Sequence, residues 1–284
     1  CDSYCSYCIV PHVRGKSRSL NPKEVLTRLV TLSNKAYKEV VLTGVHLGAY
    51  GIDHSPPTSL FELLQLIERT KPLPRIRLSS LEPMDISSSL AELVSSSSII
   101  CPHLHLPLQS GDNNVLKRMK RPYSAGDFTA LITGLVSKIP QLCLGVDVMV
   151  GFPGETEAQF ENTYNLLNDL PISYFHIFPY SRREKTEAAS FPDQIPPPVI
   201  KSRKKRLNQL NKKKVKYFYS RYLGSFLKVL FEDTRDKKTG FLKGRSRNYI
   251  PVLLDGPDWL KNSEVEVEII QVEGTMVQGK LFSQ

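Results

Sequence analysis

The sequence predicts an α/β fold in two parts, a partial (βα) barrel over residues 1–195 and a small antiparallel β-barrel over residues 222–284. In the first part, short β-branched runs alternate with stretches of helical periodicity, which is typical of parallel strands joined by crossover helices. In the second part, apolar residues alternate at period two between glycine-containing turns. Residues 196–221 are expected to form a basic helical connector between the two parts.

The elements of the first part are expected in alternating order. Asn21, Pro22 and Glu24 supply a cap, a first-turn proline and a capping-box residue, so a helix begins there. Strands are expected at 38–43, 75–80, 103–108, 143–150 and 174–178, and further helices at 59–69, 87–95, 125–138 and 157–167. Because ligand sites of such sheets and barrels lie at the carboxyl ends of the strands, the loops that follow these strands are the candidate site.

The second part has the pattern of a small barrel. Its strands are expected at 226–232, 240–246, 249–254, 263–272 and 277–282, with glycines at the turns or bends. Alternation at period two places one set of side chains inside the barrel and the other in solvent.

The net charge of +10 lies in one segment of the 284-residue chain. Residues 201–221 contain ten Lys or Arg and no acidic residue, and without them 28 basic residues balance 28 acidic ones. A basic block beside Tyr217, Tyr219 and Tyr222 suits a phosphate backbone with bases to stack on, so RNA is the expected partner. The alternative is a solvated helix face whose aromatic residues pack inward. The candidate RNA contacts are Lys204, Lys205, Lys212 and Lys213.

The composition points to a cytoplasmic protein. No apolar run approaches the ~20 residues that span a bilayer, and no secretory signal is recognisable, so no membrane partner is expected. Five cysteines are too few and odd in number for a disulfide framework, which favours a reducing compartment. Because the chain begins at Cys with a motif at its edge, it is expected to be a fragment of a longer protein.

Three cysteines lie within the first eight residues. Cys1, Cys5 and Cys8 follow a C-x3-C-x2-C spacing, and Tyr7 precedes the third. Three thiolates on one loop can hold three irons of a cubane cluster and leave the fourth iron open to a ligand. His12 provides an alternative, because C-x3-C-x2-C-x3-H also offers four ligands for structural zinc.

Residues 1–15, CDSYCSYCIVPHVRG, resemble the signature of radical S-adenosylmethionine (SAM) methylthiotransferases. The resemblance implies a radical SAM barrel in which the three cysteines bind a [4Fe-4S] cluster. It also implies that the open iron chelates the amino and carboxylate groups of SAM and that Tyr7 lies near the adenine. The family normally has an N-terminal domain with a second [4Fe-4S] cluster, and the cysteines of that domain are absent from this chain.

Several strand-end residues are candidate SAM neighbours. The stretch 146–156, VDVMVGFPGET, resembles the adenine-binding segment of the family, which implicates Gly151, Pro153 and Gly154. Ser79, Glu82 and Gln109 follow other strands, where the cofactor needs polar partners. The alternative for these three residues is ordinary capping of strand ends.

Residues 103–123 also resemble the family and carry cations suited to a carboxylate or phosphate. Arg121 is the first candidate and Arg118 the second. The alternative is that they are exposed cations at a helix end. His103 and His105 alternate with leucines along a strand, so packing or hydrogen bonding is expected for them rather than metal binding.

The loop after residue 42 bears on the substrate. TGVHLG, residues 43–48, resembles methylthiotransferases that act on N6-threonylcarbamoyladenosine beside the tRNA anticodon. His46, facing Arg118 or Arg121, would then contact the charged substituent. Isopentenyladenosine tRNA and a ribosomal protein are the alternative substrates, and a non-catalytic, zinc-stabilised RNA-binding protein is the alternative class.

The resemblance extends to the C-terminal part. GFLKGRSRNYIPV, residues 240–252, resembles the TRAM domain, an RNA-binding barrel of many methylthiotransferases. The resemblance implies a tRNA anticodon stem-loop as partner and an electron donor such as flavodoxin. A 5′-deoxyadenosyl radical would abstract the adenine C2 hydrogen, and no general acid or base is expected among the side chains.

Overall fold

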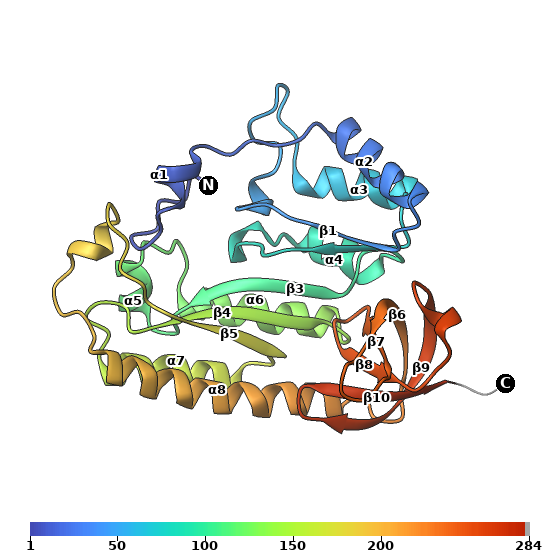
Figure 1. The fold of residues 1–284 in the computed structure, drawn as a ribbon. Helices are drawn as coiled ribbons and strands as arrows, with labels where there is room; N and C mark the ends of the chain where they lie inside the picture. Colours follow the sequence, from blue (N-terminus) through green and yellow to red (C-terminus); the bar gives the residue numbers. More distant parts are fainter. Residues whose placement is uncertain (282–284) are drawn as a thin grey trace.

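The computed structural model describes residues 1–281 and has the expected α/β fold (Figure 1). Strands β1 (Glu39–Leu42) and β2 (Arg75–Leu78) form one parallel pair, and β3 (His103–Gln109), β4 (Cys143–Val150) and β5 (Tyr174–Pro179) form a parallel three-stranded sheet. The two are joined where the Ile76 amide donates to the Ile99 carbonyl at 2.8 Å and the Leu81 amide donates to the His105 carbonyl at 3.0 Å. The strands therefore build one open, curved wall, a partial barrel.

The helices occupy the connections between these strands, as the alternation predicts. They are α1 (Val10–Arg14), α2 (Pro22–Asn34), α3 (Leu60–Thr70), α4 (Ser88–Ser96), α5 (Asn113–Arg118), α6 (Ala125–Lys138), α7 (Glu157–Asp169) and α8 (Pro197–Ser220). Short 3-10 turns lie at Leu47–Ala49, Pro83–Asp85, Glu187–Ser190 and Asp258–Leu260. At the start of α2, Asn21 accepts from the Lys23 amide at 3.0 Å, but Glu24 bonds to Arg28 instead of closing the predicted capping box.

The two faces of the β3–β5 sheet differ in polarity. Leu104, Val146 and Phe175 are buried in the main core with the helices. The residues next to them along the strands point to the opposite, inner face of the partial barrel. That face carries histidines, Asp147 and aromatic side chains, which makes it the polar lining of the wall.

Helix α8 is more than a connector. It lies along β5 in Figure 1, and Leu207 and Leu210 enter the main core while Phe218 packs with the C-terminal barrel. Phe218 therefore packs inward, as the alternative account of the aromatic residues expects, whereas Tyr217 is 70% exposed. The helix fixes the position of the barrel that follows it.

The C-terminal part is a closed barrel with the strand order β10-β8-β7-β6-β9. Its strands are β6 (Phe226–Arg235), β7 (Leu242–Ser246), β8 (Pro251–Leu254), β9 (Glu264–Glu273) and β10 (Met276–Leu281). Four pairings are antiparallel as predicted, but β8 and β10 close the barrel in parallel. A Cβ on Gly279 would lie 2.2 Å from Val267, so only glycine fits at this crowded position. Phe282, the last residue of the predicted final strand, lies outside the described residues.

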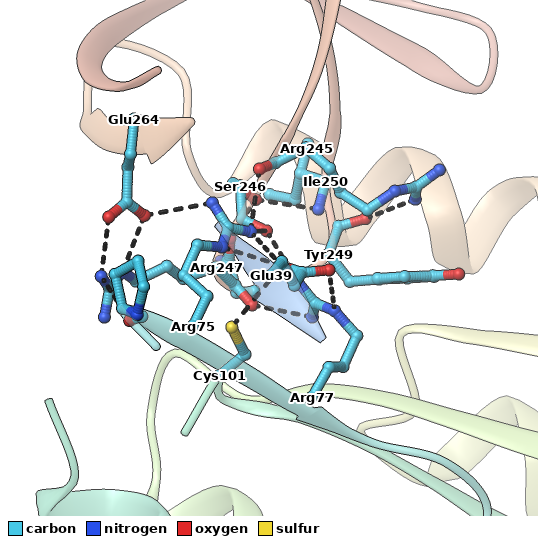
Figure 2. A network of polar contacts seen from close by, with 12 residues as sticks. Glu39, Arg75, Arg77, Cys101, Arg245, Ser246, Arg247, Tyr249, Ile250 and Glu264 are labelled. Atoms are coloured by element: carbon cyan, nitrogen blue, oxygen red, sulfur yellow. Dashed lines mark hydrogen bonds and ion pairs between the residues drawn. The ribbon is translucent and has the colours of Figure 1, made fainter. Parts of the chain in front are cut away.

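The barrel docks against the amino ends of β1 and β2 through a buried ion-pair network (Figure 2). Arg75, whose side chain is fully buried, donates to Glu39 at 2.8 Å and to Glu264 at 3.1 Å. Arg77 also pairs with Glu39, at 2.9 Å, and donates to the Arg247 carbonyl at 3.0 Å. Glu39 therefore neutralises two buried arginines at the boundary between the two parts.

We expect Glu39→Gln to reduce the free energy of unfolding by about 3–5 kcal/mol, because two buried guanidinium groups lose their shared counter-charge. Burial alone would raise the pKa of Glu39, but Arg77 and Arg75 outweigh burial and lower it. The stabilisation is thus present above the ordinary glutamate pKa of about 4.3 and is lost as the pH falls through the lower folded-state pKa. Urea unfolding at pH 7 measures the effect.

Glu232→Gln is the matched control, because Glu232 pairs with Lys243 at 3.4 Å in an exposed position. Such a pair contributes about 0–1 kcal/mol. Equal losses for the two variants would show that the Glu39 network does not hold the two parts together.

Candidate functional site

The cysteine loop lies beside the carboxyl ends of the strands. Cys1, Cys5 and Cys8 are half-buried free thiols in the segment that leads into α1. Ser6, inside the loop, is buried, and its hydroxyl donates to the Arg118 carbonyl at 2.7 Å. The Ser6 amide donates to the Met119 carbonyl at 3.2 Å, so the loop is fastened to the end of α5. Sequence reasoning missed Ser6, because nothing local marks its distant partners.

Arg121 lies directly against the loop instead of projecting into solvent. Its side chain is 3% exposed and forms an ion pair with Glu82. Its other nitrogens donate to the Tyr123 hydroxyl at 2.9 Å and to the Cys5 sulfur at 3.3 Å. The guanidinium is therefore bonded within the protein and is not an exposed cation at a helix end, and its expected contact with a substrate stays a prediction. Arg121 holds Cys5 in place and connects it to Glu82.

Arg118 also forms hydrogen bonds within the protein. Its guanidinium donates to the carbonyls of Pro153 at 2.7 Å and Gly154 at 3.2 Å. Gly154 has a φ of +72°, and a Cβ there would lie 2.5 Å from the Arg118 guanidinium. Arg118 therefore braces the turn after β4, and its expected contact with a substrate stays a prediction.

A second arginine braces the same turn from the other side. Gly151, with a φ of +77°, donates its amide to Glu155 at 2.8 Å. Arg203 of α8 pairs with Glu155 at 2.8 Å. Burial raises the pKa of Glu155, and the Arg203 guanidinium and the Gly151 amide oppose this shift. The sequence motif contains Glu155, but its partner 48 residues away could not be inferred.

The structure brings Tyr7 to the same turn. Its ring packs edge-on against Phe152 with centroids 6.5 Å apart, in a cluster that also contains Met149 and Tyr180. Burial raises the pKa of the Tyr7 phenol, so it is protonated at neutral pH. Tyr7 of the cysteine loop therefore packs against the turn that contains Gly151, Pro153 and Gly154, and the expected contacts of these residues with the adenine stay predictions.

The polar strand-end candidates lie at separate points of this edge. Ser79 donates its amide to the Leu42 carbonyl at 3.0 Å, while its buried hydroxyl finds no partner within residues 1–281. Gln109 adopts a φ of +64° at a bulge that ends β3. Glu82 pairs with Arg121, as described above. Their expected contacts with a cofactor stay predictions.

His46 lies near Glu82 but does not meet an arginine. Its Nε2 is 3.0 Å from the Asp85 carboxylate, and this hydrogen bond raises the pKa of His46. The same Asp85 oxygen accepts from the Glu82 amide at 3.0 Å. The expectation that His46 faces Arg118 or Arg121 is corrected, because His46 bonds to Asp85, Arg121 to Glu82 and Arg118 to the turn after β4.

The sequence comparison decides the family. The sequence model of the Radical SAM superfamily matches residues 1–167, more than half of the chain. The chain belongs to the Radical SAM superfamily. This membership confirms the resemblance predicted from the cysteine spacing.

Relatives of this Radical SAM chain include tRNA-modifying enzymes. It is 37% identical over 273 residues to the threonylcarbamoyladenosine tRNA methylthiotransferase MtaB of Bacillus subtilis, covering 95% of this chain and 60% of the relative. It is 35% identical over 269 residues to the tRNA-2-methylthio-N(6)-dimethylallyladenosine synthase of Pelotomaculum thermopropionicum, with coverage of 95% and 60%. The chain thus spans about 60% of the length of the curated relatives it matches.

Solved structures confirm the fold of the Radical SAM part. The radical S-adenosylmethionine methyltransferase TsrM from Kitasatospora setae superposes with a TM-score of 0.54 at 18% identity, covering 66% of this chain and 37% of that one. The coproporphyrinogen III oxidase HemN from Escherichia coli superposes with a TM-score of 0.54 at 12% identity, with coverage of 75% and 50%. Among the described residues of this Radical SAM chain, none of the helices is both long and apolar enough to span a bilayer.

Proposed function

We propose that this chain forms the SAM-cleaving and RNA-binding portion of a tRNA methylthiotransferase that acts on N6-threonylcarbamoyladenosine. The observation that carries the proposal is the fastening of the three-cysteine loop beside the Tyr7–Phe152 surface and the turn after β4. Methylthiotransferases of tRNA are among the relatives that match nearly the whole chain.

The donor set fits a [4Fe-4S] cluster better than zinc. A zinc ion would hold Cys1, Cys5, Cys8 and His12 at about 2.0–2.3 Å, which forces the ligand atoms close together. Over residues 1–281, the only convergent group of three or more metal-ligand side chains is His105, Asp147 and His176, and it includes none of the loop cysteines. A cubane places each thiolate on a different iron, so spread sulfur atoms suit it.

The surrounding surface fits SAM. The buried hydroxyls of Ser79 and Tyr180 have no partner within the described part of the chain, so each is available to a polar ligand. A [4Fe-4S] cluster held by Cys1, Cys5 and Cys8 would supply one electron, received from a donor such as flavodoxin, for the cleavage of SAM into methionine and a 5′-deoxyadenosyl radical. The chain's own residues hold the thiolates through Ser6 and Arg121 and shape the adenine surface through Arg118 and Arg203.

The proposed nucleoside rests on the loop after β1. A threonylcarbamoyl group carries a carboxylate and several hydrogen-bonding atoms, whereas an isopentenyl group is hydrocarbon. The hydrogen bond to Asp85 holds His46 at that loop through Nε2 and raises its pKa, which favours a second proton on Nδ1 that can be donated to a carboxylate. Burying such a carboxylate without a partner would cost several kcal/mol.

Mass spectrometry of digested tRNA from a deletion strain complemented with the gene tests this proposal. We expect a methylthio group on threonylcarbamoyladenosine and none on isopentenyladenosine. A methylthio group on isopentenyladenosine would contradict the choice of nucleoside, and no methylthiolation of either would contradict the proposed function.

Helix α8 is the proposed RNA-binding segment, but fewer of its cations are free than the sequence suggests. Arg203, Arg206 and Lys214 bond to groups on or next to α7, and Arg221 donates to the Pro140 carbonyl at 3.1 Å. Six lysines make no hydrogen bond or ion pair within residues 1–281: Lys201, Lys204, Lys205, Lys212, Lys213 and Lys216. The four predicted contacts belong to this free set.

We expect Lys204→Gln/Lys205→Gln and Lys212→Gln/Lys213→Gln each to weaken tRNA binding and flatten its salt dependence. Each lost phosphate contact lowers the slope of log K against log salt by roughly 0.7–0.9. Anisotropy titrations between 50 and 200 mM salt would measure the slope. Lys35→Gln/Lys38→Gln removes the same charge from exposed positions elsewhere and should leave the slope unchanged. Equal slopes for all variants would contradict RNA binding by α8 and support the alternative that its free lysines form a solvated helix face.

A further inference from the structure

The inner face of the β3–β5 sheet contains a chain of contacts that the proposed chemistry does not use. It begins where Tyr249 of the C-terminal barrel stacks on His103, with ring centroids 4.0 Å apart and planes at 15°. His103 Nε2 lies 2.8 Å from the Tyr174 hydroxyl, and that hydroxyl lies 3.3 Å from His105 Nδ1. His105 Nε2 lies 2.8 Å from Asp147.

One arrangement of protons satisfies these contacts in series. Burial lowers the pKa of His103 well below its usual value, so the ring is neutral and has one N–H. If His103 Nε2 donates to Tyr174, the Tyr174 hydroxyl can donate to His105 Nδ1, and His105 Nε2 can donate to Asp147. The buried Nδ1 of His103, which has no partner in the described chain, is then a bare acceptor. An unpaired donor would be left in the reverse arrangement.

The contacts end at an accessible pair of rings on β5. His176 Nδ1 lies 3.6 Å from the Asp147 carboxylate, and its side chain is 56% exposed. Phe178, two residues further on the same face, is 49% exposed. The two rings lie 6.2 Å apart with their planes at 82°. Part of the Phe178 ring is thus accessible for stacking, and the His176 imidazole stands perpendicular to it at its side.

This pair adjoins the cofactor surface. Asp147 is the register partner of His176, and Met149 is the partner of Phe178. Met149 belongs to the cluster that contains Tyr7 and Phe152. The inner face therefore continues from the histidine contacts, through Phe178, to the surface beside the cysteine loop.

A metal ion is the competing occupant, because His105, Asp147 and His176 place ligand atoms within 4.8 Å of one another. Binding through His105 Nε2 would require that nitrogen to lose its proton to Nδ1. Tyr174 would then lose its acceptor at His105, and the series of hydrogen bonds would have to reverse. The series of hydrogen bonds leaves fewer buried polar atoms without a partner, so hydrogen bonding is the better account of the cluster.

We infer that Phe178 and His176 form the subsite for the purine base of the target nucleoside, with Phe178 stacking on the base and His176 bonding to its polar edge. Every base presents a π-face, and an aromatic side chain that is half exposed on an inner wall suits an unstacked base. Asp147 orients His176, which leaves Nε2 directed away from the carboxylate. This inference rests on the proposed action on RNA.

The test compares two anticodon stem-loop RNAs that differ only at the target position, one with adenosine and one with an abasic ribose. We expect the wild-type protein to prefer the adenosine RNA by about tenfold in Kd, as base stacking predicts. Phe178→Ala and Phe178→Leu should lose most of this preference and Phe178→Trp should retain it. His176→Ala should lose part of it. Tyr37→Ala is the matched control, because Tyr37 is 54% exposed on another surface.

The outcomes separate the inference from the proposed function. Failure of the wild type to bind either RNA would contradict the proposed function itself. Equal binding of both RNAs, or an unchanged preference in folded Phe178→Ala, would overturn the subsite while RNA binding stands. A metal that is retained by the triple Cys→Ala variant and lost on further His176→Ala substitution would assign the cluster to metal and also overturn the inference.

Discussion

Replacing any one of Cys1, Cys5 or Cys8 by Ala is expected to abolish reductive cleavage of SAM. Each thiolate holds a different iron of the proposed cluster, so losing one leaves an iron without its protein ligand. The measurement is the yield of 5′-deoxyadenosine with dithionite as reductant, together with iron and sulfide per chain after anaerobic reconstitution. Zinc near one per chain without sulfide would instead support a zinc-stabilised RNA-binding protein.

Cys101→Ala and Cys143→Ala are the controls for this experiment. Both thiols are buried, and burial raises the pKa of Cys143 to about 12, so it stays protonated and is a poor metal ligand. These two variants should retain cluster content and SAM cleavage. Loss equal to that of the loop cysteines would remove the basis for assigning Cys1, Cys5 and Cys8 as ligands.

Arg121→Ala is expected to lose SAM cleavage and about 3–5 kcal/mol of unfolding free energy. The substitution leaves Glu82 without its ion pair in a largely buried position and releases the Cys5 sulfur. Arg121→Lys keeps the charge but cannot reach Glu82, Tyr123 and Cys5 together, so an intermediate loss is expected. Urea unfolding and 5′-deoxyadenosine yield measure the two effects.

Arg206→Ala is the matched arginine control, since Arg206 pairs with Glu157 and Glu161 on a partly exposed surface. It should lose at most about 1 kcal/mol and keep full SAM cleavage. If Arg121→Ala cleaves SAM normally and fails only in tRNA modification, Arg121 contacts the substrate and the structural account of its role is wrong.

The fold was largely predictable because its signals are local. The alternation of β-branched runs with helical periodicity, together with the cap at Asn21, marks the strands and helices of the first part. Period-two alternation marks the second barrel. The parallel pairing of β8 with β10 was not predictable, because closure of a barrel depends on which distant edges meet.

The sequence predicted the motifs of the candidate site but not the bonding partners of its arginines. The spacing of the cysteines and the position of Tyr7 are visible in eight residues. Arg118, Arg121 and Arg203 bond to partners that lie 35, 116 and 48 residues away, respectively, and the sequence does not reveal such pairs. These three arginines, whose residue type suggests contacts with a substrate or with RNA, therefore hold loops in place.

The most direct test of the account measures whether the hydrogen at adenine C2 is transferred to 5′-deoxyadenosine. The reconstituted protein is given SAM, dithionite and an anticodon stem-loop RNA whose threonylcarbamoyladenosine carries deuterium at adenine C2, and the 5′-deoxyadenosine is analysed by mass spectrometry. If the protein directs the radical to this nucleoside, the 5′-deoxyadenosine should gain one deuterium, and RNA with isopentenyladenosine should transfer none. Formation of 5′-deoxyadenosine without deuterium, or no cleavage of SAM, would contradict the account.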